Sequence, residues 1–390
     1  MSKKNGHTDS PPYISQVRLK GYKSILDTSI ELYSGLNIII GPNGSGKTNF
    51  LEFLEQALSS IPYRGNFYTY LEIVNNNDRK IWETKSNNNA EYLKKAGVSS
   101  SIVEWVYSKG QKTKPTTFDL ADEFRTPSHG YFKIFNTLQF LVPLTFIKHT
   151  LPKYLLAISN HLTISISKEG GQIQYAMPPE FENTRFVDGF LKQFPIDNIN
   201  SLPDNKEQLL FELTINSDIK SNLKKFSPIQ DIRVDKGLSI KEHNFSYFID
   251  YIGFEFLING YWLTWNMLSD GTKRLFHLIS EVTLTKGLCF VEEPELGVHP
   301  DQYRKILNFL KEASEEKQII ITTHAPRTLD ILTDKELKKI ILTRFDKELG
   351  TKMRHLTKEE IKEVTEYREE KGSTSELWSY TEFFDEAEVV

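Results

Sequence analysis

A short apolar run that ends in a glycine-rich turn constrains this sequence more than any other feature. The apolar run is Leu36–Ile40, and it continues into Gly41-Pro42-Asn43-Gly44-Ser45-Gly46-Lys47-Thr48. This segment matches G-x-x-x-x-G-K-[ST] at every fixed position, the phosphate-binding loop that joins a buried strand to a helix. Asn49–Leu58 carries apolar residues at helical spacing. The sequence therefore predicts a nucleotide-binding loop, in preference to a glycine-rich surface turn.

Each residue type of this loop has a physical reason. Glycines let successive backbone N–H groups curl round a phosphate, and the positive end of the following helix faces the same anion. We expect Lys47 to reach the β- and γ-phosphates and Thr48 to ligate Mg²⁺. The expected nucleotide contacts are Asn43, Gly44, Ser45, Gly46, Lys47, Thr48 and Asn49.

A second apolar run, Gly287–Val291, delivers two adjacent carboxylates, Glu292 and Glu293. Side chains alternate along a strand, so the two can take different tasks. One can hold Mg²⁺ and the other can orient an attacking water. An exposed acidic turn is the alternative, and the phosphate-binding loop upstream favours the catalytic interpretation.

Two polar signals flank that run. Ser269 and Gly271 open a helical segment and would present N–H groups to an anion, although an ordinary helix cap explains them equally well. His324 follows a third buried strand, Gln318–Thr323, where a histidine can hydrogen-bond a γ-phosphate. His299 precedes another helical run, and a capping or packing role is as plausible there as a functional one.

Composition excludes several classes of protein. The 390 residues suggest two or three structural units, and the net charge of −4 gives no global case for binding nucleic acid or an anionic membrane. A single cysteine, Cys289, excludes a disulfide framework and a Cys-rich zinc site, which fits a reducing, cytoplasmic location. The sequence has no apolar run of the roughly 18 residues that a membrane span needs.

Weaker patterns predict the remaining elements. Tyr13–Tyr33 reads as an antiparallel meander, and His161–Tyr175 as a β-hairpin. Phe245–Trp265 reads as two more strands around a turn at Asn259-Gly260. Short helices are expected at Ala90–Ala96, Ser101–Ser108, Tyr131–Leu138 and Phe186–Gln193.

The order of the motifs resembles ABC-type ATPase heads of the RecF, SMC and OLD kind, in the AAA-family branch. The similarity covers about residues 13–60 and 245–335, starting with Gly21-Tyr22-Lys23-Ser24 and the phosphate-binding loop. Leu268–Arg274 resembles the signature motif of that group. Val291–Pro300 resembles its Walker B motif and D-loop, with Glu292 where Asp is commoner. Thr323–Pro326 resembles its switch histidine.

The resemblance implies an α/β fold, an ABC-type P-loop head with an antiparallel β lobe, a parallel-sheet core and a mostly helical insertion. It implies that Glu292 is the Walker B acid that helps Thr48 to bind Mg²⁺, and that Glu293, His324 and Lys47 are catalytic. Ser269 and Gly271 would contact ATP bound by a second copy, so the chain would be at least a dimer. The Q-loop glutamine stays open between Gln139, Gln172, Gln174 and Gln230.

The same resemblance divides the chain. The expected parts are a disordered leader (1–12), the N-terminal part of the ATPase head (13–60), a mostly helical insertion (61–155), a β-hairpin and connecting region (156–244), the C-terminal part of the head (245–345) and a C-terminal tail (346–390). The tail, acidic with interleaved aromatics, is expected to form a final helix that packs Leu377, Trp378 and Phe384 on the head, with a docking segment for a partner as the alternative.

What the chain lacks narrows its role. It has no long heptad pattern of the kind that SMC proteins carry, and no carboxylate array of an OLD nuclease after His324. We therefore expect a sensor or regulatory ATPase that controls a separate effector, a nuclease or toxin, in bacterial anti-phage defence. The alternative is a RecF-like DNA-binding ATPase in repair or recombination, using Lys220, Lys224, Lys225 and Arg233. An ATP-gated scaffold is a third hypothesis.

Overall fold

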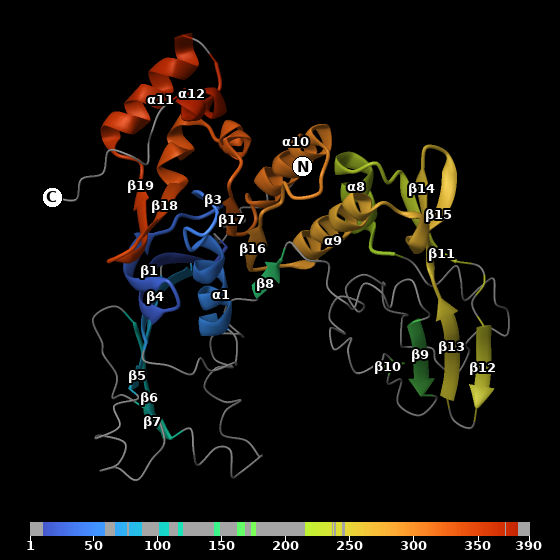
Figure 1. The fold of residues 1–390 in the computed structure, drawn as a ribbon. Coiled ribbons are helices and arrows are strands. Elements are labelled where there is room, and N and C mark those ends of the chain that lie inside the picture. Colours follow the sequence, from blue (N-terminus) through green and yellow to red (C-terminus); the bar gives the residue numbers. More distant parts are fainter. Residues whose placement is uncertain are drawn as a thin grey trace, which may run out of the picture. The chain divides into compact units, whose positions relative to one another are not determined.

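A computed structural model of the chain describes residues 11–58, 67–75, 78–87, 101–108, 116–119, 144–148, 162–167, 173–176, 215–235, 237, 239–243, 246–370 and 372–380 (Figure 1). The chain divides into two compact units. The first comprises Met1–Ile147, Thr285–Pro294 and Leu310–Val390, and the second comprises Lys148–Leu284 and Glu295–Phe309. Each is described by itself below.

A six-stranded sheet forms the centre of the first unit, in the order β19-β18-β3-β17-β16-β8. These strands are β3 (Leu36–Ile40), β8 (Leu144–Ile147), β16 (Leu288–Glu292), β17 (Ile319–Thr323), β18 (Ile340–Asp346) and β19 (Gly350–His355). All neighbours pair in parallel except β18 and β19. Every residue of β3, β16 and β17 is buried. Continuous apolar runs are typical of parallel strands covered on both faces, and for this reason the three strands could be predicted from the sequence.

A second, antiparallel sheet of the first unit runs in the order β2-β1-β4-β5-β6-β7. Its strands are β1 (Tyr13–Tyr22), β2 (Ile25–Glu31), β4 (Tyr68–Asn75), β5 (Asp78–Asn87), β6 (Ser101–Ser108) and β7 (Thr116–Asp119). Helix α1 (Lys47–Leu58) buries Phe50, Phe53 and Leu54 in one cluster with residues of β1 and of the parallel sheet. The rings of Tyr22 and Phe53 meet edge to face at 5.2 Å. The main core therefore contains side chains of both sheets and of α1.

The expected helical insertion at 61–155 is wrong for the residues that the structure describes there. They form strands β4 to β8, and Ser101–Ser108, expected as a helix, is β6. β6 pairs antiparallel with β5 and β7. The segment is rich in β-branched and aromatic residues, which fit a sheet, and pairing with strands distant in sequence decided the outcome. The predicted helices at Ala90–Ala96 and Tyr131–Leu138 lie outside the described residues.

The N-terminal meander and the C-terminal boundary also differ from expectation. The sequence suggests strands at Tyr13–Leu19 and Ser29–Tyr33 with a turn and a short strand at Gly21–Ile25 between them. The structure has two longer strands instead, β1 and β2, joined by a tight turn in which Lys23 has φ 48°. The head does not end at residue 345, because β19 pairs with β18 at the edge of the parallel sheet. The segment predicted as a C-terminal tail (346–390) also contains two helices, α11 (Lys358–Glu370) and α12 (Thr374–Tyr380). Leu377 of α12 is buried, as predicted for a final helix, whereas Phe384 lies outside the described residues.

The second unit contains two small sheets, β10-β9-β13-β12 and β11-β14-β15. Its strands are β9 (Leu162–Ser167), β10 (Ile173–Ala176), β11 (Asp231–Val234), β12 (Ser239–His243), β13 (Ser246–Ile252), β14 (Phe254–Ile258) and β15 (Tyr261–Thr264). The β9–β10 hairpin and the turn at Asn259-Gly260 confirm the predictions, but Phe245–Trp265 contains three strands, β13, β14 and β15, where two were expected. Both turn residues have positive φ, 51° and 84°, as a tight two-residue hairpin loop demands. The predicted helix Phe186–Gln193 lies outside the described residues.

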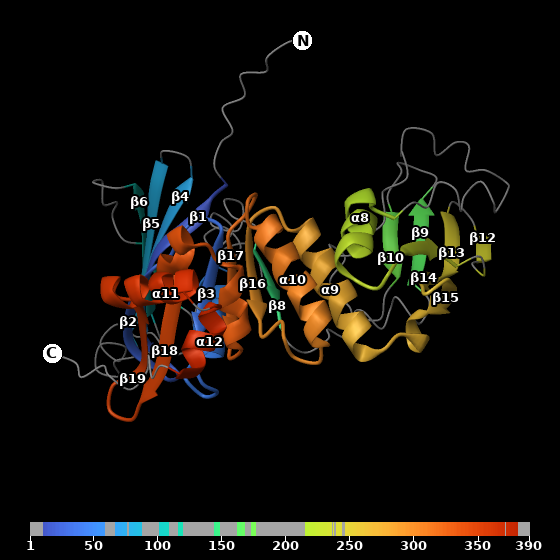
Figure 2. The ribbon, with the colours of Figure 1, turned by 90° about the horizontal axis from the view of Figure 1, so that it is seen from above.

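Helices complete the second unit (Figure 2). These are α8 (Ser217–Phe226), η2 (Trp265–Met267), α9 (Asp270–Leu284) and the first part of α10 (Pro300–Ala313). Phe256, Trp265 and Phe276 form an aromatic cluster with ring centroids 5.3 to 5.8 Å apart. No helix among the described residues is long and apolar enough to cross a membrane.

Candidate nucleotide-binding site

The glycine-rich loop lies between β3 and α1, as predicted, and α1 begins at Lys47. The glycines of the loop differ in how much space a Cβ atom would have at each position. A Cβ on Gly41 would lie 2.1 Å from the Thr343 carbonyl oxygen, and one on Gly46 would lie 2.0 Å from Thr351 Oγ1, so packing against β18 and β19 requires both glycines. Gly44 has φ 80° and only open space on its Cβ side. The loop is therefore closed against the sheet and open at Gly44.

Lys47 curls back over the loop that precedes it. Its side chain is 4% exposed, and Nζ donates to the carbonyl oxygens of Gly41 at 2.8 Å and Pro42 at 2.9 Å. Ser45 Oγ is buried and has no hydrogen-bond partner among the described residues. A buried hydroxyl without a partner is rare in folded proteins. A buried ammonium, this hydroxyl and the first turn of α1 together fit a phosphate group.

Thr48 and Glu292 meet although 244 positions separate them in the sequence. Thr48 Oγ1, in the first turn of α1, donates to Glu292 Oε1 at 2.6 Å. Glu292 is the last residue of β16 and is 4% exposed. A hydroxyl and a carboxylate oxygen are the hard ligands that Mg²⁺ prefers, and this ion usually takes its other ligands from phosphate and water. Among the described residues, no group of three or more His, Cys, Asp and Glu side chains could hold a metal.

Glu293 turns to a different partner from Glu292. Its carboxylate Oε1 lies 3.7 Å from Nδ1 of His324, which follows β17. Glu293 has φ 42°, a left-handed conformation that is strained for a residue with a side chain. Its backbone N–H donates to the Thr322 carbonyl at 2.9 Å, which keeps the turn attached to β17. The structure thus brings together Glu293 and His324, two residues predicted separately, at the carboxyl ends of neighbouring strands.

Asn49, at the end of the loop, is bonded to a side chain of the β1–β2 turn. Its amide donates to Ser24 Oγ at 2.7 Å, and Ser24 Oγ lies 2.7 Å from Thr351 Oγ1. Thr351 also donates its backbone N–H to the Ser24 carbonyl. Sequence reasoning missed Thr351 because only the β18–β19 hairpin brings it to the loop. The nearby Lys23 forms an ion pair with Glu52, and this hydrogen bond raises the pKa of Lys23.

Ser269 and Gly271 belong to the second unit, whereas the loop, Glu292, Glu293 and His324 belong to the first. Ser269 Oγ accepts from the Thr272 N–H at 3.2 Å, which is the helix cap considered as the alternative. A Cβ on Gly271 would lie 2.8 Å from the Gly297 carbonyl oxygen. Their contact with ATP of a second copy therefore stays a prediction.

His299 and the glutamines bear on two further predictions. His299 Nδ1 accepts from the Asp301 N–H at 3.4 Å at the start of α10, the geometry of a capping histidine. Gln139 and Gln172 lie outside the described residues, and Gln174 and Gln230 belong to the second unit. The Q-loop glutamine is not assigned.

Comparison with known proteins gives a family. The family described as "AAA domain, putative AbiEii toxin, Type IV TA system" matches residues 36–330. The structural maintenance of chromosomes protein 3 homolog of Plasmodium falciparum is 36% identical over 82 residues, 18% of this chain and 7% of that protein. The DNA double-strand break repair Rad50 ATPase of Methanopyrus kandleri is 33% identical over 67 residues, 17% of this chain and 7% of its own length. The chain thus spans only a small part of these relatives.

Solved SMC heads are similar at a low level. The SmcHead bound to the C-winged helix domain of ScpA has a TM-score of 0.45 and 15% identity, covering 89% of this chain and 99% of that one. The SMC head domain from Thermotoga maritima has a TM-score of 0.41 and 12% identity, covering 88% and 99%. Since the family match spans most of the sequence, the chain belongs to the family described as "AAA domain, putative AbiEii toxin, Type IV TA system".

Proposed function

We propose that this chain binds ATP with Mg²⁺, hydrolyses it to ADP and phosphate, and uses that cycle to control a separate effector protein. The observation that carries the proposal is the meeting of Thr48 with Glu292 at 2.6 Å and of Glu293 with His324 at 3.7 Å. The phosphate-binding loop, β16 and β17 contribute these residues. A stable fold does not require such a concentration of charged and polar groups at one sheet edge.

Each residue has a distinct task in this proposal. Lys47 exchanges the Gly41 and Pro42 carbonyls for phosphate oxygens when ATP enters. Thr48 and Glu292 hold Mg²⁺, which when bound neutralises charge on the β- and γ-phosphates. The Glu293 carboxylate orients the attacking water and accepts its proton. His324 donates a hydrogen bond to the γ-phosphate from the neighbouring strand.

Self-association completes the proposed site. Ser269 caps α9, a helix of 15 residues whose N-terminus carries a partial positive charge. In the proposal this N-terminus, with Gly271, meets the γ-phosphate held by a second copy. The working unit is then at least a dimer, and ATP lies between the copies.

The effector is proposed to be a nuclease or toxin in bacterial anti-phage defence, and the ATPase to act in the cytoplasm. The description of the matching family, which names a putative toxin and a Type IV TA system, supports a role in a system of that kind.

DNA binding is the alternative, and the contacts of the candidate basic residues weaken it. Lys220 pairs with Asp231 at 2.8 Å, and Arg233 pairs with Glu255 at 2.7 Å. Arg233 also stacks over the Trp262 ring at 3.9 Å. Of the residues expected to form the patch, Lys224 and Lys225 are exposed. The Rad50 relative, a DNA-repair ATPase by name, keeps this alternative testable.

The test compares wild type with Glu293→Gln in steady-state ATP hydrolysis and in light scattering. Glu293→Gln should lower kcat by about a hundredfold or more, because it removes the proton acceptor. The variant should still bind ATP and should accumulate as a dimer with it. Glu366→Gln, on the exposed face of α11, is the control. Hydrolysis by Glu293→Gln at the wild-type rate would refute the assigned role.

The effector is tested by gentle capture of the tagged chain from its native host, followed by mass spectrometry. A stoichiometric second protein that dissociates from, or is activated by, the captured chain on ATP addition supports the sensor role. Duplex DNA without a protein partner would favour the repair alternative.

A further inference from the structure

The segment that follows His324 is held by two layers of hydrogen bonds. It is the 3-10 helix η3 (Pro326–Ile331). In the inner layer, the Ala325 N–H donates to Thr323 Oγ1 at 2.9 Å, and Thr328 Oγ1 donates to the Ala325 carbonyl at 2.8 Å. The two threonine hydroxyls lie 3.1 Å apart, and both side chains are fully buried. Both backbone groups of Ala325, the residue directly after His324, are therefore bonded to the hydroxyls of Thr323 and Thr328.

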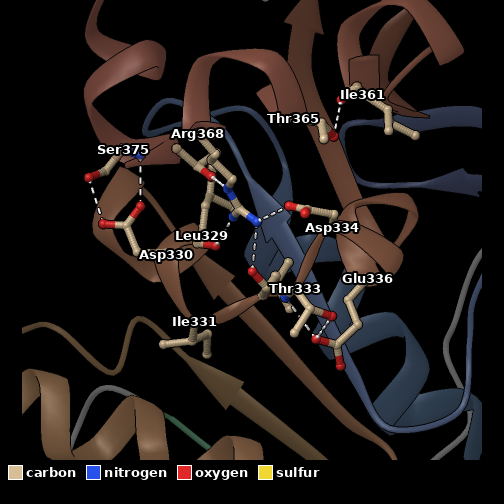
Figure 3. A network of polar contacts seen from close by, with 12 residues as sticks. Leu329, Asp330, Ile331, Thr333, Asp334, Glu336, Ile361, Thr365, Arg368 and Ser375 are labelled. Atoms are coloured by element: carbon tan, nitrogen blue, oxygen red, sulfur yellow. Dashed lines mark hydrogen bonds and ion pairs between the residues drawn. The ribbon is translucent and has the colours of Figure 1, made fainter. Parts of the chain in front are cut away.

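Arg368 of α11 makes the outer layer (Figure 3). Its Nη1 donates to the Leu332 carbonyl at 2.9 Å and to Asp334 Oδ1 at 2.8 Å, and its Nη2 donates to the Leu329 carbonyl at 3.4 Å. Nε donates to Thr374 Oγ1 at 2.6 Å, at the start of α12. The side chain is only 17% exposed. One planar guanidinium thus ties the last turn of η3 and the residues after it to both C-terminal helices.

Asp330 makes a second attachment. Its carboxylate accepts from the Ser375 N–H at 2.8 Å and from Ser375 Oγ at 2.7 Å (Figure 3). Asp330 belongs to η3 and Ser375 to α12, so η3 is held through this side chain as well as through the Leu329 carbonyl. Charge-assisted bonds of this kind are about twice as strong as neutral ones.

We propose that α11 and α12 are a positioning element for His324, with Arg368 as its central residue. The inference rests on the proposed ATPase function, because it concerns the histidine assigned to the γ-phosphate. The bonds of Arg368 and Asp330 described above end on residues 329–334 and 374–375, whereas Lys47 and Thr48 are held by the loop and by β16. Loosening η3 should therefore disturb the hydrolytic step and leave ATP binding in place.

Arg368→Lys tests this most directly, because it keeps the charge and removes the planar set of donors. We expect kcat to fall by about tenfold or more, as for other displacements of catalytic groups, with the Kd for ATP unchanged within about twofold. Lys362→Ala is the matched control: Lys362 lies on the same helix, is 76% exposed and pairs only loosely with Glu366 at 3.5 Å. Asp330→Asn is a second variant should Arg368→Lys fold poorly.

A double-mutant cycle that combines Arg368→Lys with His324→Ala distinguishes an effect on the position of His324 from a general loss of stability. Arg368→Lys should add almost nothing to the kcat loss of His324→Ala if it acts through that residue. Independent, multiplying losses would overturn the proposal. Hydrogen exchange of the backbone amides at 325–331, measured without nucleotide, should be faster in Arg368→Lys and unchanged in Lys362→Ala. Unchanged hydrogen exchange in Arg368→Lys would also overturn the positioning proposal. Hydrogen exchange does not depend on ATP hydrolysis, so it tests that proposal even if the wild type hydrolyses no ATP. A wild type without ATP hydrolysis would refute the proposed function and leave the positioning proposal to the exchange measurement.

Discussion

At the scale of single residues, the contact between Thr48 and Glu292 gives the sharpest prediction. Thr48→Val keeps the shape of the side chain and removes the hydroxyl that bonds Glu292 at 2.6 Å. We expect ATP affinity with Mg²⁺ to fall by about tenfold or more, since one of two protein oxygens for the ion is lost. Without Mg²⁺, affinity should change by less than about twofold. Calorimetric titration with and without Mg²⁺ measures both.

The control for this substitution is Thr365→Val in α11. Thr365 Oγ1 donates to the Ile361 carbonyl at 2.8 Å, one turn earlier in the helix. This variant removes the same chemical group outside the loop, so nucleotide binding should match wild type. Equal losses with and without Mg²⁺ in Thr48→Val would contradict the assignment of Thr48 as a metal ligand.

His277 predicts a pH dependence of stability. It is buried in α9, and burial, followed by the charge of Arg274, lowers its pKa from 6.5 to about 3. Below pH 6.5 the unfolded chain binds a proton that the folded chain cannot, so stability falls with pH until about pH 3. Between pH 7 and pH 5 this residue should cost about 2 kcal/mol.

Urea unfolding of wild type and His277→Gln at both pH values measures that contribution. The difference in unfolding free energy between pH 7 and pH 5 should shrink in His277→Gln. It should persist in His299→Gln, because that side chain is 72% exposed. The same slope in wild type and His277→Gln would show that the histidine is not the titrating group.

At the scale of elements, Gln318 joins the two sheets of the first unit. Gln318 lies directly before β17. Its side-chain amide accepts a hydrogen bond from the Ile14 N–H at 2.9 Å and donates to the carbonyl oxygens of Ile14 at 2.9 Å and Tyr33 at 3.0 Å. Gln318→Met keeps the volume and leaves these backbone groups without their partner, which should cost about 3 kcal/mol. The control is Gln230→Met at an exposed position, which should lower the free energy of unfolding by less than about 1 kcal/mol. Thermal unfolding of both variants measures the difference. Equal melting temperatures in the two variants would contradict this link.

At the scale of the whole molecule, charge predicts weak DNA binding. The net charge is −4, and Asp231 and Glu255 already neutralise Lys220 and Arg233. A duplex should bind no tighter than about 10 µM at about 0.15 M salt. Replacing both carboxylates, Asp231→Asn with Glu255→Gln, should strengthen binding and steepen its salt dependence. Fluorescence anisotropy across a salt series measures this, and tight binding by wild type would favour the repair alternative.

Local chemistry was readable from the sequence. The phosphate-binding loop, the buried strands that end at Glu292 and Thr323, and the Asn259-Gly260 turn all depend on neighbours within a few residues. Their patterns are therefore complete in a short window. Ser101–Ser108 shows the limit, because an apolar run of that length suits a helix or a strand until its pairing partners are known.

The sequence by itself determined that this chain carries a phosphate-binding loop, two acidic residues after a buried strand and a histidine after another, and hence the family to which it belongs. Only the tertiary structure decided that Thr48 meets Glu292 and Glu293 meets His324. Only the tertiary structure shows that Thr351 packs against Gly46 and that Arg368 bonds the Leu329 carbonyl of η3. The physical reason is that these contacts arise where strands and helices distant in sequence pack together, and no pattern along one segment specifies the partner that another segment supplies.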